Sequence, residues 1–263
     1  MSESFKRGSI RVVNDSVPNI AHAMNMGWMV ARNELIGFVN DDIEFSANWV
    51  KNVKYWFNSL TDAKSIGGPA YDFNQRKMAT MLTKDTFYAR LYDKLVMGGD
   101  LFKTAIINDA GGYSIGNDEP KCPVRVSQFS GVNMVVLKNV LQELGGFMTI
   151  FKYSGPEGYF YLQMAKRRYP VYLVPGCSVI HYPNPSGGTR DPFYIAHDYA
   201  IYFRMIRPET TLGKIRKILN ELSFFIYWSL IYKKDLRKFF RLIDGYLAGI
   251  RLYIRHPNGD VVA

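Results

Sequence analysis

The sequence predicts an α/β fold followed by a helical region, and three observations support this. Strand-type and helix-type patterns alternate over roughly the first 60 residues, which is typical of a sheet with helices packed on it. Short apolar runs of strand length recur up to about residue 180. From about residue 190 the chain is amphipathic, basic and rich in aromatic residues, as in a layer of helices. We therefore expect two parts, residues 1–190 and residues 191–263.

The length and composition exclude several classes of protein. The chain has 263 residues, of which 48% are hydrophobic and 21% are charged. This ordinary globular composition excludes a disordered or collagen-like chain. Two cysteines exclude a disulfide framework and a cysteine-rich zinc module. The first ten residues lack the apolar core of a signal peptide, and no apolar run is long enough to span a bilayer. We therefore expect a cytoplasmic protein.

The first elements of the expected sheet alternate between strands and helices. Residues 10–13 form a short β-like run, and residues 19–32 place apolar side chains at three- and four-residue intervals, as in an amphipathic helix. Residues 35–39 are continuously apolar, which predicts a buried parallel strand. The run ends at Asn40-Asp41-Asp42, and a helix with one aromatic face follows.

Between about residues 74 and 125 lies a turn-rich section whose pattern predicts helices and strands less clearly. Regular structure is expected again after it. A long loop in a compact domain is often functional. The helix expected next ends at Gly145-Gly146, a typical end signal. The expected strands span residues 129–137, 171–175 and 178–180, and the expected helices span residues 138–144 and 153–168.

Asn40, Asp41 and Asp42 form a candidate binding site at the end of the expected strand. In open α/β sheets, ligands bind beyond the carboxyl ends of the strands. Adjacent acidic oxygens there suit a hard divalent cation, Mg²⁺ or Mn²⁺, that also holds a diphosphate. The alternative is an Asx turn between a strand and a helix, and the triplet taken alone favours that turn.

The order of these motifs over residues 10–185 resembles that of the family 2 glycosyltransferases, which have the GT-A fold. Before the triplet stand the pattern Asn19-x-x-x-Ala23-x-Asn25-x-Gly27 and an apolar strand, with Ala21 where the family has a glycine. The later matching segments are Ser130-Gly131, Leu144-Gly145-Gly146-Phe147, Val174-Pro175 and Val179-Ile180-His181. The resemblance implies transfer of a sugar from a nucleotide-sugar donor to a hydroxyl acceptor on a glycan, a lipid-linked glycan or a protein, with Mn²⁺ or Mg²⁺ as cofactor and inversion at the sugar.

The same resemblance implies the residues that bind the donor. Asp42 and His181 are expected to bind the metal ion. Asn40 and Asp41 are expected to contact the donor at the same strand end. Arg190 follows the Gly-rich turn of residues 187–189 and is a further candidate for the phosphates, with an ordinary surface loop as the alternative.

Glu157 is the catalytic residue that the resemblance implies. A carboxylate here takes the proton from the acceptor hydroxyl as its oxygen attacks the anomeric carbon. The family has an acidic pair at this point, whereas this chain has Glu157-Gly158, so the role rests on Glu157 alone. The structural alternative is a capping box, in which Ser154 and Glu157 cap the start of a helix with Pro156 in its first turn.

The resemblance also implies that the nucleotide-binding part of the fold is incomplete. Members of the family begin with a strand–helix–strand unit of roughly 30 residues or more, and only 18 residues precede Asn19 here. A truncated reading frame, a partner chain or oligomer that completes the fold, or lost or altered donor binding would each explain this. The last explanation leads to an alternative function: a degenerate, non-catalytic glycosyltransferase-like module that binds a membrane or a partner protein.

The positive charge is concentrated in the C-terminal quarter. Residues 201–263 hold 12 Lys or Arg against 5 Asp or Glu, a net charge of +7, whereas residues 1–200 hold 21 against 18, a net charge of +3. An apolar stripe from Leu212 to Ile226 with basic neighbours suits a helix lying on an anionic membrane, here the inner face, or a helical layer covering the α/β core. Nucleic acid has no support beyond charge, so we do not expect it as a partner.

Overall fold

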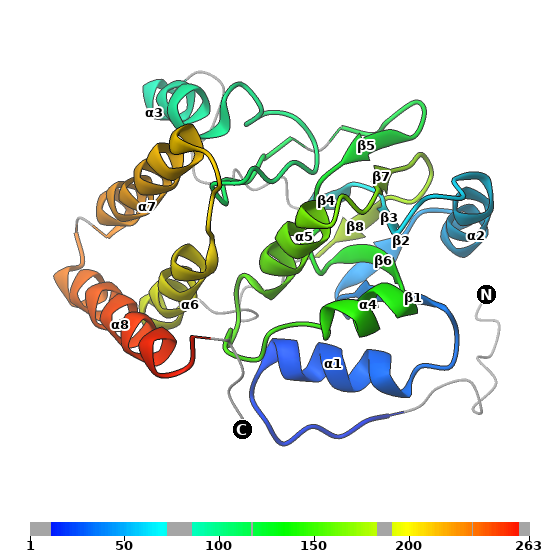
Figure 1. The fold of residues 1–263 in the computed structure, drawn as a ribbon, viewed down its shortest axis with the longest axis horizontal. Helices are drawn as coiled ribbons and strands as arrows, with labels where there is room; N and C mark the ends of the chain where they lie inside the picture. Colours follow the sequence, from blue (N-terminus) through cyan, green and yellow to red (C-terminus); the bar gives the residue numbers. More distant parts are fainter. Residues whose placement is uncertain (1–11, 73–85, 117, 183–190, 233, 258–263) are drawn as a thin grey trace.

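A computed structural model of the chain describes residues 12–72, 86–116, 118–182, 191–232 and 234–257. Two mixed β-sheets with flanking helices form one part, and long helices form the C-terminal part (Figure 1). The expected α/β class with a helical C-terminal part is therefore confirmed. The boundary expected between residues 190 and 191 stays a prediction.

The strands form one sheet of five and one of three. In the five-stranded sheet the spatial order is β1 (Leu35–Val39), β6 (Asn133–Leu137), β3 (Ser65–Gly67), β7 (Val171–Leu173) and β5 (Val124–Val126). The smaller sheet has the order β2 (Ile43–Phe45), β8 (Val179–His181) and β4 (Ala70–Asp72). Only the β3–β7 and β4–β8 pairs are parallel among the described strands.

The helices divide between the two parts of the structure. Those that accompany the sheets are α1 (Ile20–Val30), α2 (Trp49–Ser59), α4 (Lys138–Leu144) and α5 (Pro156–Lys166). The others are α3 (Phe87–Tyr92), which continues as the π-helical η3 (Asp93–Met97), and α6 (Pro192–Met205), α7 (Thr211–Ile231) and α8 (Leu236–Arg255). None of the described helices is both long and apolar enough to cross a membrane.

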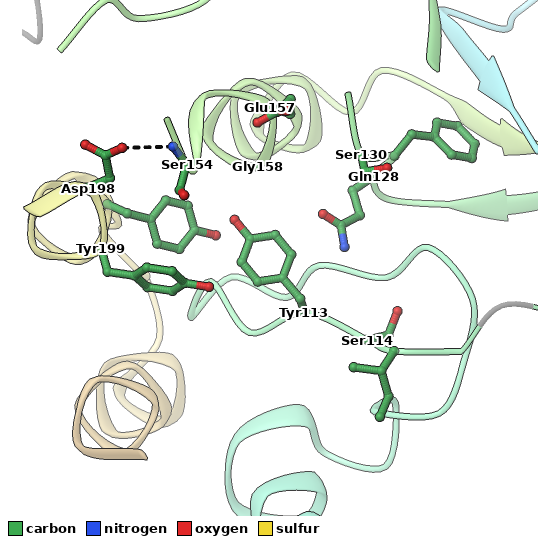
Figure 2. Close-up of a pocket in the computed structure, with 13 residues that line it drawn as sticks. Tyr113, Ser114, Gln128, Ser130, Ser154, Glu157, Gly158, Asp198 and Tyr199 are labelled. Carbon is green, nitrogen blue, oxygen red and sulfur yellow. Dashed lines mark hydrogen bonds between the residues drawn. The ribbon is translucent and has the colours of Figure 1, made fainter. Parts of the chain in front are cut away.

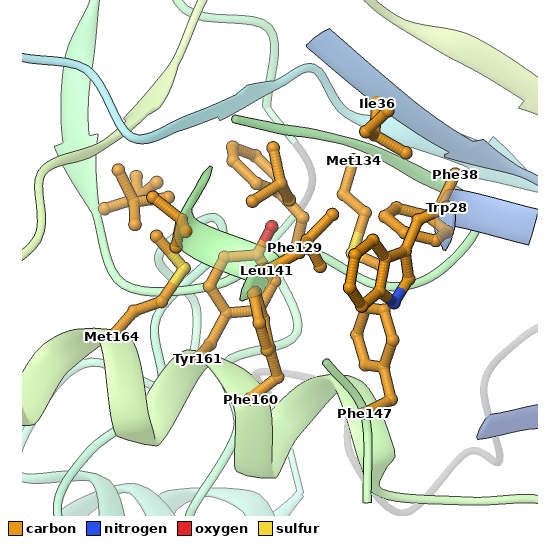
Figure 3. Packing of buried hydrophobic residues seen from close by; sticks show 14 of the residues in the cluster. Trp28, Ile36, Phe38, Phe129, Met134, Leu141, Phe147, Phe160, Tyr161 and Met164 are labelled. Carbon is orange, nitrogen blue, oxygen red and sulfur yellow. The ribbon is translucent and has the colours of Figure 1, made fainter. Parts of the chain in front are cut away.

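Two apolar clusters position α5 between the sheet and the C-terminal helices. On one side, Phe160, Tyr161 and Met164 of α5 pack toward the five-stranded sheet (Figure 3). The buried hydroxyl of Tyr161 lies 2.9 Å from Ser65 Oγ, which ties α5 to β3. On its other side, α5 contributes Leu162 to a second cluster made mainly by α6 and its neighbours. The start of α5 is therefore held from both directions.

The prediction of a buried parallel strand at residues 35–39 is wrong in its pairing. β1 is antiparallel to β6 and stands at the edge of the five-stranded sheet. Ile36 and Phe38 are buried, whereas the alternate residues Gly37 and Val39 are exposed. An apolar run shows that a strand contacts apolar surroundings, but its direction and edge position depend on the tertiary partner.

The expected strand at residues 10–13 is also wrong where it can be compared. Val12 and Val13 belong to no strand, and residues 10 and 11 lie outside the described residues. Four residues of β-like composition specify a strand only when a neighbouring edge pairs with them. The first regular element in the described chain is instead α1, whose N-cap is Asn19.

Candidate functional site

Pairing of β2 with β8 brings two of the predicted metal ligands together. Ile43 is paired with His181, and the backbone N–H of Tyr182 donates to the carbonyl oxygen of Asp42 at 2.8 Å. Nε2 of His181 consequently lies 3.1 Å from Oδ1 of Asp42. Nδ2 of Asn40 approaches the same imidazole nitrogen at 3.5 Å. Asn40, Asp42 and His181 thus form one cluster, while Asp41 beside them is exposed.

The Asp42–His181 pair fits a divalent cation. Oδ1 of Asp42 is buried and receives no hydrogen bond, so the 3.1 Å approach of His181 lacks hydrogen-bond geometry. A buried oxygen without a donor is costly unless a ligand compensates it. Carboxylate and neutral imidazole are both ligands for Mn²⁺-like ions. Within the described residues no three His, Cys, Asp or Glu side chains form a complete metal site, so a cation here needs further ligands, such as phosphate oxygens.

Arg190 lies outside the described residues, so its expected contact with phosphates stays a prediction. The same holds for the Gly-rich turn of residues 187–189 before it.

Glu157 lies in the first turn of α5, with its carboxylate against Gly131. A methyl group on Gly131 would come within 2.5 Å of Oε1 of Glu157, so a larger residue here would displace the carboxylate. Burial raises the pKa of the Glu157 carboxyl above its usual range, and backbone N–H groups of Glu157 and Gly131 partly oppose that rise. The carboxylate is therefore a stronger base than an exposed glutamate.

The capping box that was the structural alternative for Glu157 does not form. The N-cap of α5 is Gly155, with a φ of 93°, which makes no side-chain capping hydrogen bond. Ser154 instead donates its backbone N–H to Oδ2 of Asp198 at 2.8 Å. Pro156 occupies the first turn as expected. Ser154 and Glu157 therefore do not form the capping box that their spacing in the sequence predicted.

Glu157 lines two cavities at once. The first, the β1 cavity, has a volume of about 500 Å³ and runs along β1 and α1, with Asn40, Gly131 and Glu157 in its wall. The second, the tyrosine cavity, has a volume of about 350 Å³ and lies between α5, α6 and the loop at residues 113–115 (Figure 2). Its wall includes Tyr113, Tyr199 and Tyr202 together with Gln128 and Ser130.

The phenol of Tyr113 fills the space beside Gly158. A methyl group on Gly158 would come within 1.9 Å of the Tyr113 hydroxyl, so the phenol occupies the space beside Glu157. The ring of Tyr113 stacks on that of Tyr202, with centroids 5.7 Å apart. Burial raises the pKa of Tyr113 well above its usual range, and Tyr202, Tyr199 and Glu157 add to the rise, so the phenol stays neutral. Sequence spacing gave no signal linking Tyr113 to Glu157.

Asp198 of α6 anchors the segment that leads into α5. Its two carboxylate oxygens accept backbone N–H groups of Lys152, Tyr153 and Ser154 at 2.7 to 3.1 Å (Figure 2 shows the bond to Ser154). Nδ1 of His197 lies 2.8 Å from Oδ1 of the same carboxylate. The C-terminal helices therefore help to build the Glu157 site. No local sequence signal marked Asp198 as part of this site.

Comparison with known proteins gives distant structural likenesses, among them the two that follow. The chain is similar to the mannosyltransferase PcManGT from Pyrobaculum calidifontis, solved with GDP-Man and Mn²⁺, at 12% identity and a TM-score of 0.44, over 90% of this chain and 55% of that one. It is also similar to GalNAc-T7, solved with UDP, GalNAc and Mn²⁺, at 10% identity and a TM-score of 0.47, over 79% of this chain and 42% of that one. The chain thus spans about half the length of these structures.

No protein-family model matches the sequence, and a comparison with curated proteins finds no match. Because both TM-scores are below 0.5, the two structural likenesses carry no argument about the chemistry of this chain. The chemistry rests on the residues of the site.

Proposed function

We propose that this chain is a metal-dependent glycosyltransferase that moves a sugar from a nucleotide-sugar donor to a hydroxyl acceptor with inversion. The observation that carries the proposal is the position of Glu157, whose carboxylate borders both the β1 cavity and the tyrosine cavity. A transfer between two substrates requires a proton acceptor where they meet. Glu157 has the position, the enclosure and the raised pKa for that task.

The donor side of the proposed site is the strand-end cluster. Asp42 and His181 hold the divalent cation, and Asn40, Asp41 and Arg190 contact the diphosphate or sugar. When bound, the cation supplies Lewis-acid stabilisation of the negative charge on the departing diphosphate. Asn40 connects the two functions, because it lies 3.5 Å from His181 and also lines the β1 cavity that reaches Glu157.

The acceptor side of the proposed site is the tyrosine cavity. Aromatic faces pack on the C–H faces of sugar rings, and the neighbouring Gln128 and Ser130 supply hydrogen-bonding groups of the kind that orient a polar ligand. The acceptor hydroxyl gives its proton to Glu157 while its oxygen bonds to the anomeric carbon. The bond to the diphosphate breaks on the opposite face, which inverts the configuration.

Turnover of nucleotide-sugars in the presence of Mn²⁺ tests the proposal. Release of nucleoside diphosphate is measured with a panel of donors and sugar acceptors for the wild type, Glu157→Gln and Asp42→Ala. Glu34→Gln, an exposed carboxylate outside the site, is the matched control. We expect turnover by the wild type and the control alone. Equal turnover by all four proteins would refute the site assignment.

The second candidate function is a degenerate, non-catalytic module that binds a partner chain. It is favoured by one observation: among the described strands, β1 pairs with β6 alone, and an edge without a described strand partner is the kind of edge to which another polypeptide adds a strand. Calorimetry with UDP or GDP and Mn²⁺ separates the candidates. Metal-dependent binding supports the transferase, whereas its absence together with a stable hetero-complex supports the module.

A further inference from the structure

Helix α7 presents an aliphatic stripe to solvent. Six Leu or Ile side chains, each between 44% and 58% exposed, repeat at three- and four-residue intervals along its outer side: Leu212, Ile215, Ile218, Leu222, Ile226 and Leu230. At 1.5 Å per residue the stripe is ~27 Å long. A row of exposed aliphatic side chains at this spacing is unusual on the solvent-exposed side of a helix and is the kind of feature that marks an interaction site.

The packing of α7 fixes the direction in which the stripe points. On the opposite side of the helix, Phe224 is buried and stacks on Tyr199 of α6, with centroids 4.7 Å apart. Glu221 pairs with Arg204 of α6 at 2.8 Å. On a flank, Asn220 accepts a hydrogen bond from Tyr92 Oη at 2.9 Å. The stripe therefore faces away from these described contacts of α7. The helix α7 itself lies at the side of the molecule remote from α2 (Figure 1).

Exposed basic side chains lie near both ends of α7. Lys214 near the start of α7 is exposed, as are Lys234, Arg237 and Lys238 just beyond its end. Residues 209–241 hold 8 Lys or Arg and 3 Asp or Glu, a net charge of +5. Two of the three acidic residues are paired with basic ones, Glu221 with Arg204 and Asp235 with Lys238. The segment that carries the stripe thus has a net positive charge.

We propose that this surface docks on an anionic lipid bilayer, with α7 lying parallel to the membrane plane. Burial of the aliphatic side chains in the headgroup–acyl boundary supplies one part of the attraction, and the basic residues supply the other. A lipid surface fits better than a protein partner, because the stripe is a convex row of Leu and Ile. Protein hot spots are instead enriched in Trp, Tyr and Arg. This inference is independent of the proposed transferase activity.

Co-sedimentation of the full chain with vesicles tests the proposal. One set of vesicles contains phosphatidylcholine alone, and the other also contains phosphatidylglycerol. Ile218→Ser with Leu222→Ser removes the centre of the stripe. The matched control is Val50→Ser with Tyr55→Ser on α2, where the exposed fractions are 60% and 59%. We expect the stripe variant to lose about tenfold in its partition onto anionic vesicles, and the control to bind like the wild type.

A charge variant and a mass measurement complete the test. Lys234→Gln with Arg237→Gln is expected to weaken binding roughly tenfold, and high salt is expected to weaken it similarly. Wild-type binding that is equal on neutral and anionic vesicles would overturn the proposal, as would binding unchanged in the stripe variant. The proposal would also be overturned if the wild type without lipid were a dimer and the stripe variant were a monomer. A second copy of the chain would then cover this surface.

Discussion

The two acidic side chains of the site, Glu157 and Asp42, are held in contrasting ways. Glu157 is half-buried at the start of α5, packs against Gly131 and has a raised pKa. Asp42 lies at the end of a short strand pair, where its buried Oδ1 lacks a donor and faces His181. A proton acceptor gains from enclosure, because burial disfavours its charged form, whereas a metal ligand needs lone pairs that no protein donor occupies. The contrast supports separate roles for the two carboxylates.

The largest expected effect comes from neutralising Glu157. General-base catalysis accelerates the chemical step by about 10²–10⁴-fold, so Glu157→Gln is expected to lower kcat by that factor. Binding of UDP or GDP with Mn²⁺, measured by calorimetry, is expected to stay unchanged, since the donor cluster is intact. If nucleotide binding is lost together with kcat, the separation of the two carboxylates is wrong.

Asp42 and Asp41 provide the next test, because they are adjacent but differ in burial. Asp42→Asn is expected to weaken the Mn²⁺-dependent affinity for the nucleoside diphosphate by about 100-fold, through loss of an anionic metal ligand. Asp41→Asn, at an exposed position, is expected to change this Mn²⁺-dependent affinity only a few-fold. Calorimetry with and without Mn²⁺ measures both. Equal losses in the two variants would contradict assignment of the metal to Asp42.

A substitution at Gly131 tests the enclosure of Glu157. The added methyl group of Gly131→Ala would meet Oε1 of Glu157 at 2.5 Å, so the carboxylate must move. We expect kcat to fall roughly tenfold, with Mn²⁺-dependent nucleotide binding kept. A crystal structure of the variant would show the displaced carboxylate. Full activity with that carboxylate displaced would show that its position is unimportant.

A smaller effect on rate is expected from Asp198, which supports the site from α6. Both of its oxygens accept N–H groups, so in Asp198→Asn either orientation of the amide places an NH₂ group against a donor. Buried mispairing costs about 1–3 kcal/mol, so Tm should fall by ~5 °C and kcat only a few-fold. Asp62→Asn is the control, since the hydrogen bond that Asp62 accepts from Tyr172 is exposed. An unchanged Tm would contradict the anchoring role.

The pH dependence follows from the raised pKa of Glu157. The base is active only when ionised, so the acid limb of kcat/KM is expected at a higher pH than the usual value of 4.5. The folded state also disfavours the charged form, so the wild type loses stability as pH rises from 4.5 through the raised pKa. Glu157→Gln removes that loss, and its Tm relative to the wild type should rise across the same window. A constant difference in Tm would contradict a raised pKa.

Part of this site could be predicted from sequence because the signals are local. Asn40, Asp41 and Asp42 directly follow an apolar strand, and His181 ends a later one. Gly145 ends α4 with a φ of 76°, as the Gly145-Gly146 signal predicted. Such features are determined by residues close together in the sequence, so the folded structure retains them.

Other features depend on contacts between distant segments and could not be predicted. Tyr113 reaches Gly158 from the turn-rich middle of the chain, and Asp198 reaches back to Ser154 from α6. The contact with Asp198 also explains why the capping box failed, since it takes the backbone N–H of Ser154. The edge position of β1 likewise depends on which strand lies beside it.

The most direct measurement is a crystal structure of the full chain with Mn²⁺ and UDP or GDP. We predict the metal within about 2.3 Å of an oxygen of Asp42 and of Nε2 of His181, with the diphosphate on the metal and its terminal phosphate directed toward Glu157 through the β1 cavity. A nucleotide bound elsewhere, or a metal that leaves both Asp42 and His181 untouched, would contradict the proposed division between donor cluster and base.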